Sequence, residues 1–240
     1  MPDPEAMSDQ LRAFVDEAPA ARRPHVQFLH SALEGLAPGA RVLDVGAGDA
    51  PYREIFESFD YVTNDWAGTE HVPDRPYDIV APAHALPVED GSFDAVVCTQ
   101  VLEHLPEPWV AVEEFHRVLA PGGRVVITAP LTWFLHELPH DYYRFTAYGL
   151  AHLLSRAGFQ DIDVQPMNDS PATIAELLRH LRWVLGRADD GRDDARAVAG
   201  EVVAGLAEAV DRLSWLDTQR LLPISFSAVA FTAPASKGDS

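Results

Sequence analysis

Short apolar runs alternate along the chain with longer stretches in which apolar residues recur at helical spacing. The mostly apolar stretches at 93–98 and 124–129 are typical of parallel strands that are buried on both faces. The other expected strands cover residues 41–45, 61–63, 77–80, 162–165 and 225–232. This alternation of strands and helices predicts an α/β fold with a Rossmann-like, doubly wound, mostly parallel sheet of seven strands.

Apolar residues at helical spacing predict two helices before the first strand, and three more helices between strands at 51–58, 105–120 and 146–156. Pro51 suits the first turn of one of them, and Thr146 suits the N-cap of another. We expect Pro121-Gly122-Gly123 to end the helix at 105–120.

A strongly helical stretch at about 171–219, with a charged break at 189–194, separates the sixth expected strand from the last. The simple strand–helix pattern needs only a short connection there, so we interpret this stretch as an insert. Core packing, a homodimer contact and a lid over a pocket are all open as its use. We expect one domain, divided into N-terminal helices (1–38), a core (39–170), the helical insert (171–222) and the last strand (223–233).

The first strand leads directly into a glycine turn, in the stretch Arg41–Pro51. Gly46 and Gly48 have no Cβ, so they can adopt positive φ and let the backbone approach a ligand closely. Strand, glycine turn and helix N-terminus together form a cradle in which free amides point at a nucleotide-sized ligand.

Composition narrows the possible partners. The formal net charge of −19 argues against nucleic acid and anionic membrane surfaces as partners. The single cysteine, Cys98, cannot form an intrachain disulfide, and we expect it in the core. The N-terminus has no signal-peptide pattern and no apolar run is long enough for a bilayer, so we expect a cytoplasmic protein.

The glycine turn, Asp44–Gly48, is the first of several short motifs along the chain. The others are, in order, Asp65, Leu86-Pro87, Gln100–Leu105 and Pro121–Gly123. With this set, the chain resembles the class I S-adenosylmethionine-dependent methyltransferases, and most of all their type 11 family. The resemblance covers about 40–165. It implies S-adenosylmethionine as the cofactor and leaves the methyl acceptor open.

The resemblance also implies roles for individual residues. Amides around Gly46 and Gly48 approach the methionine part of the cofactor, Asp44 holds its amino group or the loop, and Asp65 accepts both ribose hydroxyls. The loop before Leu86 flanks the adenine, although the usual acid of the family is replaced there by Pro82. The expected cofactor residues are Asp44, Gly46, Ala47, Gly48, Asp65, Trp66, Ala83, His84, Ala85 and Gln100.

The segment His136–His140 matches the zinc-protease pattern H-E-x-x-H. That chemistry needs an intact helix, and Pro139 disrupts one between the two histidines. We therefore expect no protease activity and no metal.

The segment His136–Arg144 follows the fifth strand, at the edge of the sheet where a cofactor methyl group would lie, so we expect the acceptor there. Methyl transfer to oxygen gains from a base that titrates near neutral pH. The candidates are His140, with Asp141 orienting it or acting itself, then His136 and His104. The alternative of a solvated loop whose histidines cap helices stays open, as does capping for His104. We favour oxygen methylation of a small molecule, for which a sugar or a natural-product intermediate is a weak analogy.

Two other functions compete with this interpretation. A nicotinamide-dependent oxidoreductase also uses a glycine turn and an acid after the second strand, but Pro51 stands where its third glycine belongs. A non-catalytic S-adenosylmethionine-binding protein would use the helical insert for oligomerisation.

Overall fold

The computed structural model describes residues 7–66, 76–187, 193–217 and 219–235. Its sheet consists of seven strands in the order β3-β2-β1-β4-β5-β7-β6. Their bounds are β1 Arg41–Val45, β2 Asp60–Asp65, β3 Ile79–Val80, β4 Phe93–Thr99, β5 Leu119–Pro130, β6 Gln160–Pro166 and β7 Ser225–Phe231. Strands β1 to β5 pair in parallel, whereas β7 is antiparallel to both β5 and β6. The predicted doubly wound, mostly parallel sheet is confirmed.

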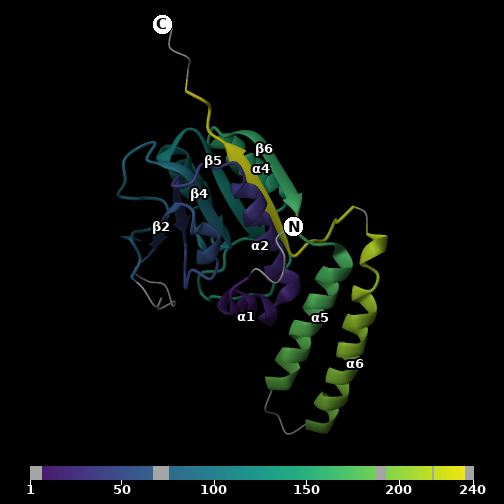
Figure 1. Cartoon of the computed structure of the whole chain (residues 1–240). Coiled ribbons are helices and arrows are strands. Elements are labelled where there is room, and N and C mark those ends of the chain that lie inside the picture. The colour runs from purple at the N-terminus through teal and green to yellow at the C-terminus, as the bar shows by residue number, and fades with distance from the viewer. Residues whose placement is uncertain (1–6, 67–75, 188–192, 218, 236–240) are drawn as a thin grey trace, which may run out of the picture.

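Helices cover both faces of this sheet (Figure 1). Helices α1 (Asp9–Glu17) and α2 (Pro19–Leu33) pack on one face with the short 3₁₀ helix η2 (Arg53–Phe56), and their core includes Leu11, Leu29 and Phe56. Helices α3 (Pro108–Val118) and α4 (Ala147–Arg156) cover the opposite face. The strands are therefore apolar on both sides, as the burial of β4 shows from Ala95 to Cys98.

The predicted helix at 51–58 is wrong, because the chain makes only the four residues of η2 there. The glycine turn does not end at Gly48: Ala50 still has a φ of 48°, in the left-handed region that a helix cannot continue from. Tyr52 then serves as the N-cap, and Ile55 and Phe56 supply the buried anchor.

The turn Pro121-Gly122-Gly123 also differs from its prediction, since α3 has already ended at Val118 and the turn lies inside β5. The ladder between β4 and β5 shifts register between Phe93 and Ala95, opposite this segment. Gly123 is required there, because a Cβ would lie 2.8 Å from the carbonyl oxygen of Ala120.

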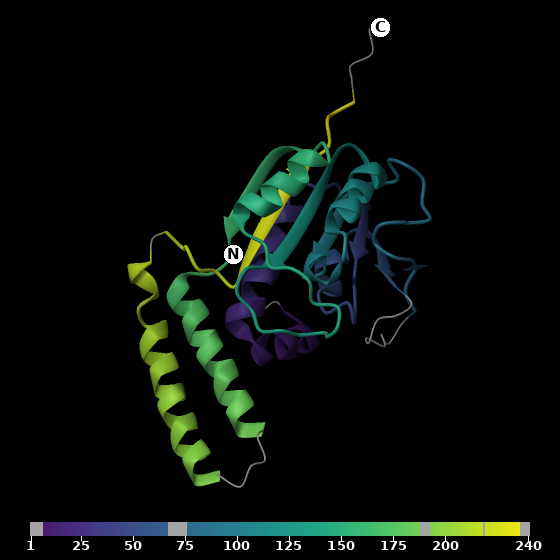
Figure 2. The ribbon, with the colours of Figure 1, turned by 180° about the vertical axis from the view of Figure 1, so that it is seen from behind.

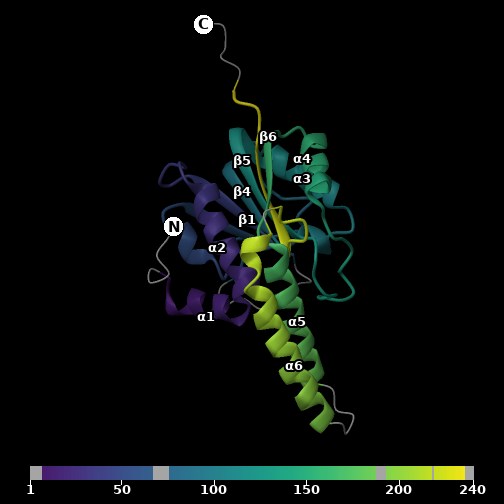
Figure 3. The same cartoon turned by 90° about the vertical axis from the view of Figure 1, so that its right-hand side faces the viewer.

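The helical insert forms a hairpin of α5 (Ser170–Arg187) and α6 (Asp193–Asp211), followed by the 3₁₀ helix η4 (Ser214–Leu216). Figure 3 shows that the two helices lie side by side and project away from the sheet. Several large apolar side chains of the hairpin are exposed, among them Trp183, Val202 and Leu206. None of the described helices is long and apolar enough to cross a membrane.

Candidate functional site

The glycine turn after β1 is held against two neighbouring strands. Gly46 has a φ of 71°, and its N–H and that of Ala47 both donate to the carbonyl oxygen of Asn64 on β2. A Cβ at Gly46 would collide with the side chain of Val101, which follows β4. Glycine is therefore required at this position both by conformation and by space.

Asp65 ends β2 beside this turn, as predicted. One carboxylate oxygen accepts the N–H of Gly48 at 2.9 Å, and the other accepts the N–H of Trp66 at 2.8 Å. The side chain of Asp65 is buried, whereas Trp66 is 45% exposed. The predicted acid and the predicted glycine turn thus form one connected unit at the carboxyl ends of the strands.

Asp44 lies beneath the turn and is almost fully buried. Its carboxylate accepts a hydrogen bond of 2.5 Å from the hydroxyl group of Tyr61. Burial raises the pKa of Asp44 to about 6, and the Tyr61 hydrogen bond limits this rise. Tyr61 was absent from the predicted site, because nothing in β2 alone shows which side chain it faces.

Gln100 follows β4 and has a φ of 55°, which is unusual for a residue with a side chain. Its side chain is held from two other strands, since Nε2 donates to the Thr128 hydroxyl at 3.1 Å and Oε1 accepts from Ser225 at 3.4 Å. Backbone strain of this kind gathers at functional sites.

The predicted adenine segment forms a turn after β3. Ala83 is buried, His84 is exposed, and the N–H of Ala85 donates to the carbonyl oxygen of Pro82. Contacts of these three residues with a nucleoside stay a prediction.

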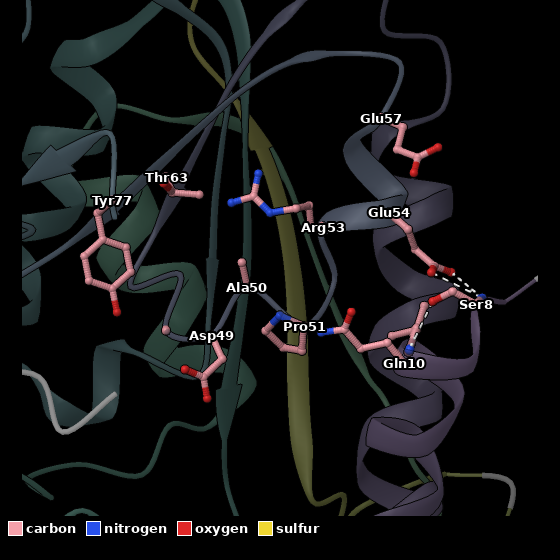
Figure 4. Close-up of a pocket in the computed structure, with 12 residues that line it drawn as sticks. Ser8, Gln10, Asp49, Ala50, Pro51, Arg53, Glu54, Glu57, Thr63 and Tyr77 are labelled. Atoms are coloured by element: carbon pink, nitrogen blue, oxygen red, sulfur yellow. Dashed lines mark hydrogen bonds between the residues drawn. The ribbon is translucent and has the colours of Figure 1, made fainter. Parts of the chain in front are cut away.

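A cavity of about 340 Å³ opens beside the glycine turn, between the turn, α1 and η2 (Figure 4). Its lining includes Gly48, Asp49, Arg53, Thr63 and Tyr77. Of the predicted cofactor residues, Gly48 lines this cavity and Gln100 does not. The cavity therefore lies on the α1 side of the glycine turn.

The loop between β5 and α4 crosses the end of the sheet at which α1 also lies (Figure 2). Asp141 is its anchor: both carboxylate oxygens accept from Arg144, at 2.6 and 2.9 Å, and one also accepts the N–H of His136. Arg144 holds the pKa of Asp141 well below its usual range. Asp141 was predicted to orient His140 or to act as a base. The structure instead pairs it with Arg144 and places it 3.6 Å from His136 Nδ1.

His104, His136 and the buried Glu103 form a compact cluster, in which one ligand atom of each lies within 4.8 Å of the others. Glu103 and His104 belong to the 3₁₀ helix η3 (Leu102–His104) after β4, and His136 comes from the loop after β5. The rings of His104 and His136 meet edge to face at 4.7 Å. Burial raises the pKa of Glu103 to about 8 and lowers the pKa of His136.

The side chain of His140 is exposed and outside this cluster, although the His140 backbone carbonyl oxygen lies 2.8 Å from His104 Nδ1. Its ring meets Trp66 edge to face at 5.5 Å, and its Nδ1 is 3.2 Å from the hydroxyl group of Tyr142. His136 and His140 share no helix, as Pro139 predicted. The loop between β5 and α4, called the acceptor loop below, also contacts the helical hairpin: the ring of Phe134 stacks on that of His180 of α5, with the ring centroids 4.0 Å apart.

Comparison with known proteins agrees with this geometry. A family model described as a methyltransferase domain matches residues 43–127. A demethylmenaquinone methyltransferase of Renibacterium salmoninarum is 39% identical over 101 residues, which cover 39% of this chain and 42% of the relative. A 27-O-demethylrifamycin SV methyltransferase of Amycolatopsis mediterranei is 31% identical over 131 residues, and 48% of each protein is covered. The chain thus spans less than half the length of these curated relatives.

A solved S-adenosylmethionine-dependent methyltransferase of Archaeoglobus fulgidus shares the fold, with a TM-score of 0.56 and 18% identity over 93% of this chain and 100% of that one. Residues 43–127 thus match a methyltransferase domain, and the chain has the fold of the class I S-adenosylmethionine-dependent methyltransferases. The resemblance is confirmed, and the nicotinamide-dependent alternative no longer has support.

Sequence patterns alone did not indicate Glu103, Arg144 or His180 as residues of the site. Glu103 stands inside a quoted motif, but its burial and its histidine neighbours depend on how the loop after β5 folds back. Arg144 was noted as the end of that loop without a partner. His180 had no signal, because nothing in its helix indicates which loop it contacts.

Proposed function

We propose that this methyltransferase transfers a methyl group from S-adenosylmethionine to an oxygen atom of a small molecule. One observation carries the proposal: the ring of His140 contacts Trp66, the residue after Asp65. This contact brings the expected acceptor loop beside the expected cofactor cradle.

The residues at the cradle fit the nucleoside. A buried carboxylate at Asp65 adjoins amides of the glycine turn, and the left-handed backbone of Gly46 and Gly48 leaves no side chain in the way. Asp65 would accept the ribose hydroxyls, and Asp44 would hold the turn in place from below through Tyr61. When bound, S-adenosylmethionine supplies a methyl group on a cationic sulfur.

His140 is the best-placed base of the acceptor loop. It would take the proton of the acceptor hydroxyl, while its Nδ1 stays paired with Tyr142. Much of the remaining barrier falls through alignment and exclusion of water. The rifamycin relative, an O-methyltransferase by name, supports oxygen as the acceptor atom and a natural product as a candidate class.

The helical hairpin would form one wall of the acceptor site. Phe134 of the loop stacks on His180, which in turn lies 5.3 Å from Trp183. This aromatic group suits a partly apolar acceptor.

Calorimetry with S-adenosylhomocysteine tests the cofactor half of the proposal. The protein should bind it, and Asp65→Asn should weaken binding at least tenfold, because an amide offers the ribose diol a poorer acceptor. Glu113→Gln, the same change at an exposed position of α3, is the control. Absence of binding to the folded protein would reject the proposal.

Mass spectrometry of mixtures with candidate hydroxylated metabolites tests the acceptor half, with His140→Ala as the variant. A non-catalytic S-adenosylmethionine-binding protein is the second candidate, favoured by the exposed apolar residues of the hairpin. That function requires cofactor binding without methylated product and a stable oligomer on a sizing column.

A further inference from the structure

Glu103 is a buried carboxylate without a visible reason to be buried. Its side chain has no exposed surface, and neither carboxylate oxygen accepts a hydrogen bond from another described residue. Burying an acid in this way is costly unless a cation or a set of donors compensates. The backbone of Glu103 is also fixed, because the N–H groups of Tyr142 and Tyr143 donate to its backbone carbonyl oxygen at 2.8 and 3.2 Å.

Hydrogen bonds to backbone carbonyl oxygens determine which ring nitrogen of the two neighbouring histidines carries the proton. Nδ1 of His104 is 2.8 Å from the carbonyl oxygen of His140, and Nδ1 of His136 is 3.1 Å from that of Phe134. A carbonyl oxygen only accepts, so each Nδ1 carries the proton and the lone pair of each ring lies on Nε2. His104 Nε2 is buried without a hydrogen-bond partner among the described residues and lies 3.8 Å from a Glu103 oxygen.

We propose that Glu103, His104 and His136 bind one divalent transition-metal ion of the Zn²⁺ or Co²⁺ class. Two imidazoles and one carboxylate are a common ligand set for such ions in proteins, whereas Mg²⁺ and Ca²⁺ prefer oxygen ligands. The ligand atoms already lie within 4.8 Å of one another, so small side-chain rotations close the site around an ion.

The surroundings complete the arrangement that metal sites need. Backbone carbonyl oxygens hold the Nδ1–H groups of both histidines, which is the usual way in which proteins orient such ligands. Asp141, fixed by Arg144, accepts the backbone N–H of His136 and so positions its segment. Glu137 Oε2 lies 3.7 Å from His104 Nε2, so a fourth possible oxygen ligand is close to the site.

This site is independent of the proposed methyl transfer, since none of its three ligands belongs to the cofactor cradle. A consequence that does rest on the proposed function is that an acceptor hydroxyl on the ion would lose its proton more readily. His136 shares its loop with His140, and His104 Nδ1 lies 2.8 Å from the carbonyl oxygen of His140, so one acceptor would lie near both the ion and that imidazole.

Titration of the chelator-treated full chain with Co²⁺ tests the proposal, followed by visible absorption and by competition with Zn²⁺. We expect one equivalent to bind at micromolar concentration or tighter. Glu103→Gln, which keeps the shape of the side chain, and His136→Asn should each weaken binding at least a hundredfold. His152→Asn removes an exposed histidine of α4 and should leave binding unchanged.

Binding only at millimolar Co²⁺ would overturn the proposal. So would an affinity that Glu103→Gln and His136→Asn leave unchanged while the thermal unfolding of both variants shows a folded protein. Binding of S-adenosylhomocysteine, measured on the same samples, separates the two proposals. If the wild-type protein binds Co²⁺ but not S-adenosylhomocysteine, only the proposed function is rejected.

Discussion

The glycine turn and the cluster of Glu103, His104 and His136 lie at the same end of the sheet but are built differently. The turn unit, from Asp44 to Asp65, uses one strand, one turn and the adjacent strand, and its contacts link β1 with β2. The cluster joins a 3₁₀ helix after β4 to a loop after β5. Local backbone geometry defines the first region, whereas packing of a returning loop defines the second.

The largest effect that separates the two regions is expected from Gly46→Ala. The φ of 71° costs about 1–2 kcal/mol for a residue with a side chain, and the collision with Val101 adds about 1–3 kcal/mol. Chemical denaturation should therefore show a loss of about 2–5 kcal/mol in the free energy of unfolding.

Gly35→Ala is the matched control. Its φ is 79°, but a Cβ there meets nothing within 4 Å, so the variant keeps the strain and lacks the collision. Equal losses in the two variants would contradict close packing of the turn against Val101.

The next effect concerns Asp44 and pH. Its folded pKa of about 6 lies above its ordinary value, so the folded state binds the proton more tightly than the unfolded state. Its contribution to stability is complete at pH below its ordinary pKa and is lost as the pH rises through 6. The loss by pH 7 is about 3 kcal/mol at most.

Asp44→Asn removes this titration, so the difference in unfolding free energy between variant and wild type should shift in favour of the variant from pH 4 to pH 7. Denaturation curves at several pH values measure it. Binding of S-adenosylhomocysteine by the variant should weaken at the same time, since a destabilised group at a site is commonly kept for function. A flat difference across this range would show that folding does not raise the pKa of Asp44.

The difference between the regions also explains what could be predicted from sequence. The strands, Thr146 as N-cap and the position of Asp65 at the end of the second strand could be predicted, because they depend on neighbouring residues and on the order of parallel strands. The helix at 51–58 failed because Ala50 extends the turn, which no apolar pattern reveals. The burial of the Glu103 carboxylate and the pairing of Asp141 with Arg144 depend on the path of the loop after β5. The path of a loop produces no periodic pattern in the sequence, so neither feature could be predicted.

A smaller effect is expected from breaking the Asp141–Arg144 pair. Asp141→Asn weakens two charge-assisted hydrogen bonds to Arg144, for a loss of about 2 kcal/mol in unfolding free energy at pH 7. Because Arg144 lowers the pKa of Asp141, its contribution is present above the ordinary pKa of an aspartate and is lost as the pH falls below it.

Arg144→Gln distinguishes an anchor from a base. If Asp141 anchors the loop, both variants should lose similar stability and weaken Co²⁺ binding alike, because both release the segment that carries His136. A large loss of methyl transfer in Asp141→Asn alone, with equal stability in both variants, would restore Asp141 as a base.

The smallest expected effect is at Thr146, where the acceptor loop ends and α4 begins. Its hydroxyl oxygen accepts the N–H of Gly149 at 3.0 Å, and Thr146→Ala should cost about 1 kcal/mol of unfolding free energy, as loss of an N-cap usually does. Thr146→Ser keeps the acceptor and should cost little. Neither change touches the Asp141–Arg144 pair, so Co²⁺ affinity should stay that of the wild type. If Thr146→Ala weakens Co²⁺ binding while Thr146→Ser does not, the start of α4, rather than the Asp141–Arg144 pair, positions the cluster of Glu103, His104 and His136.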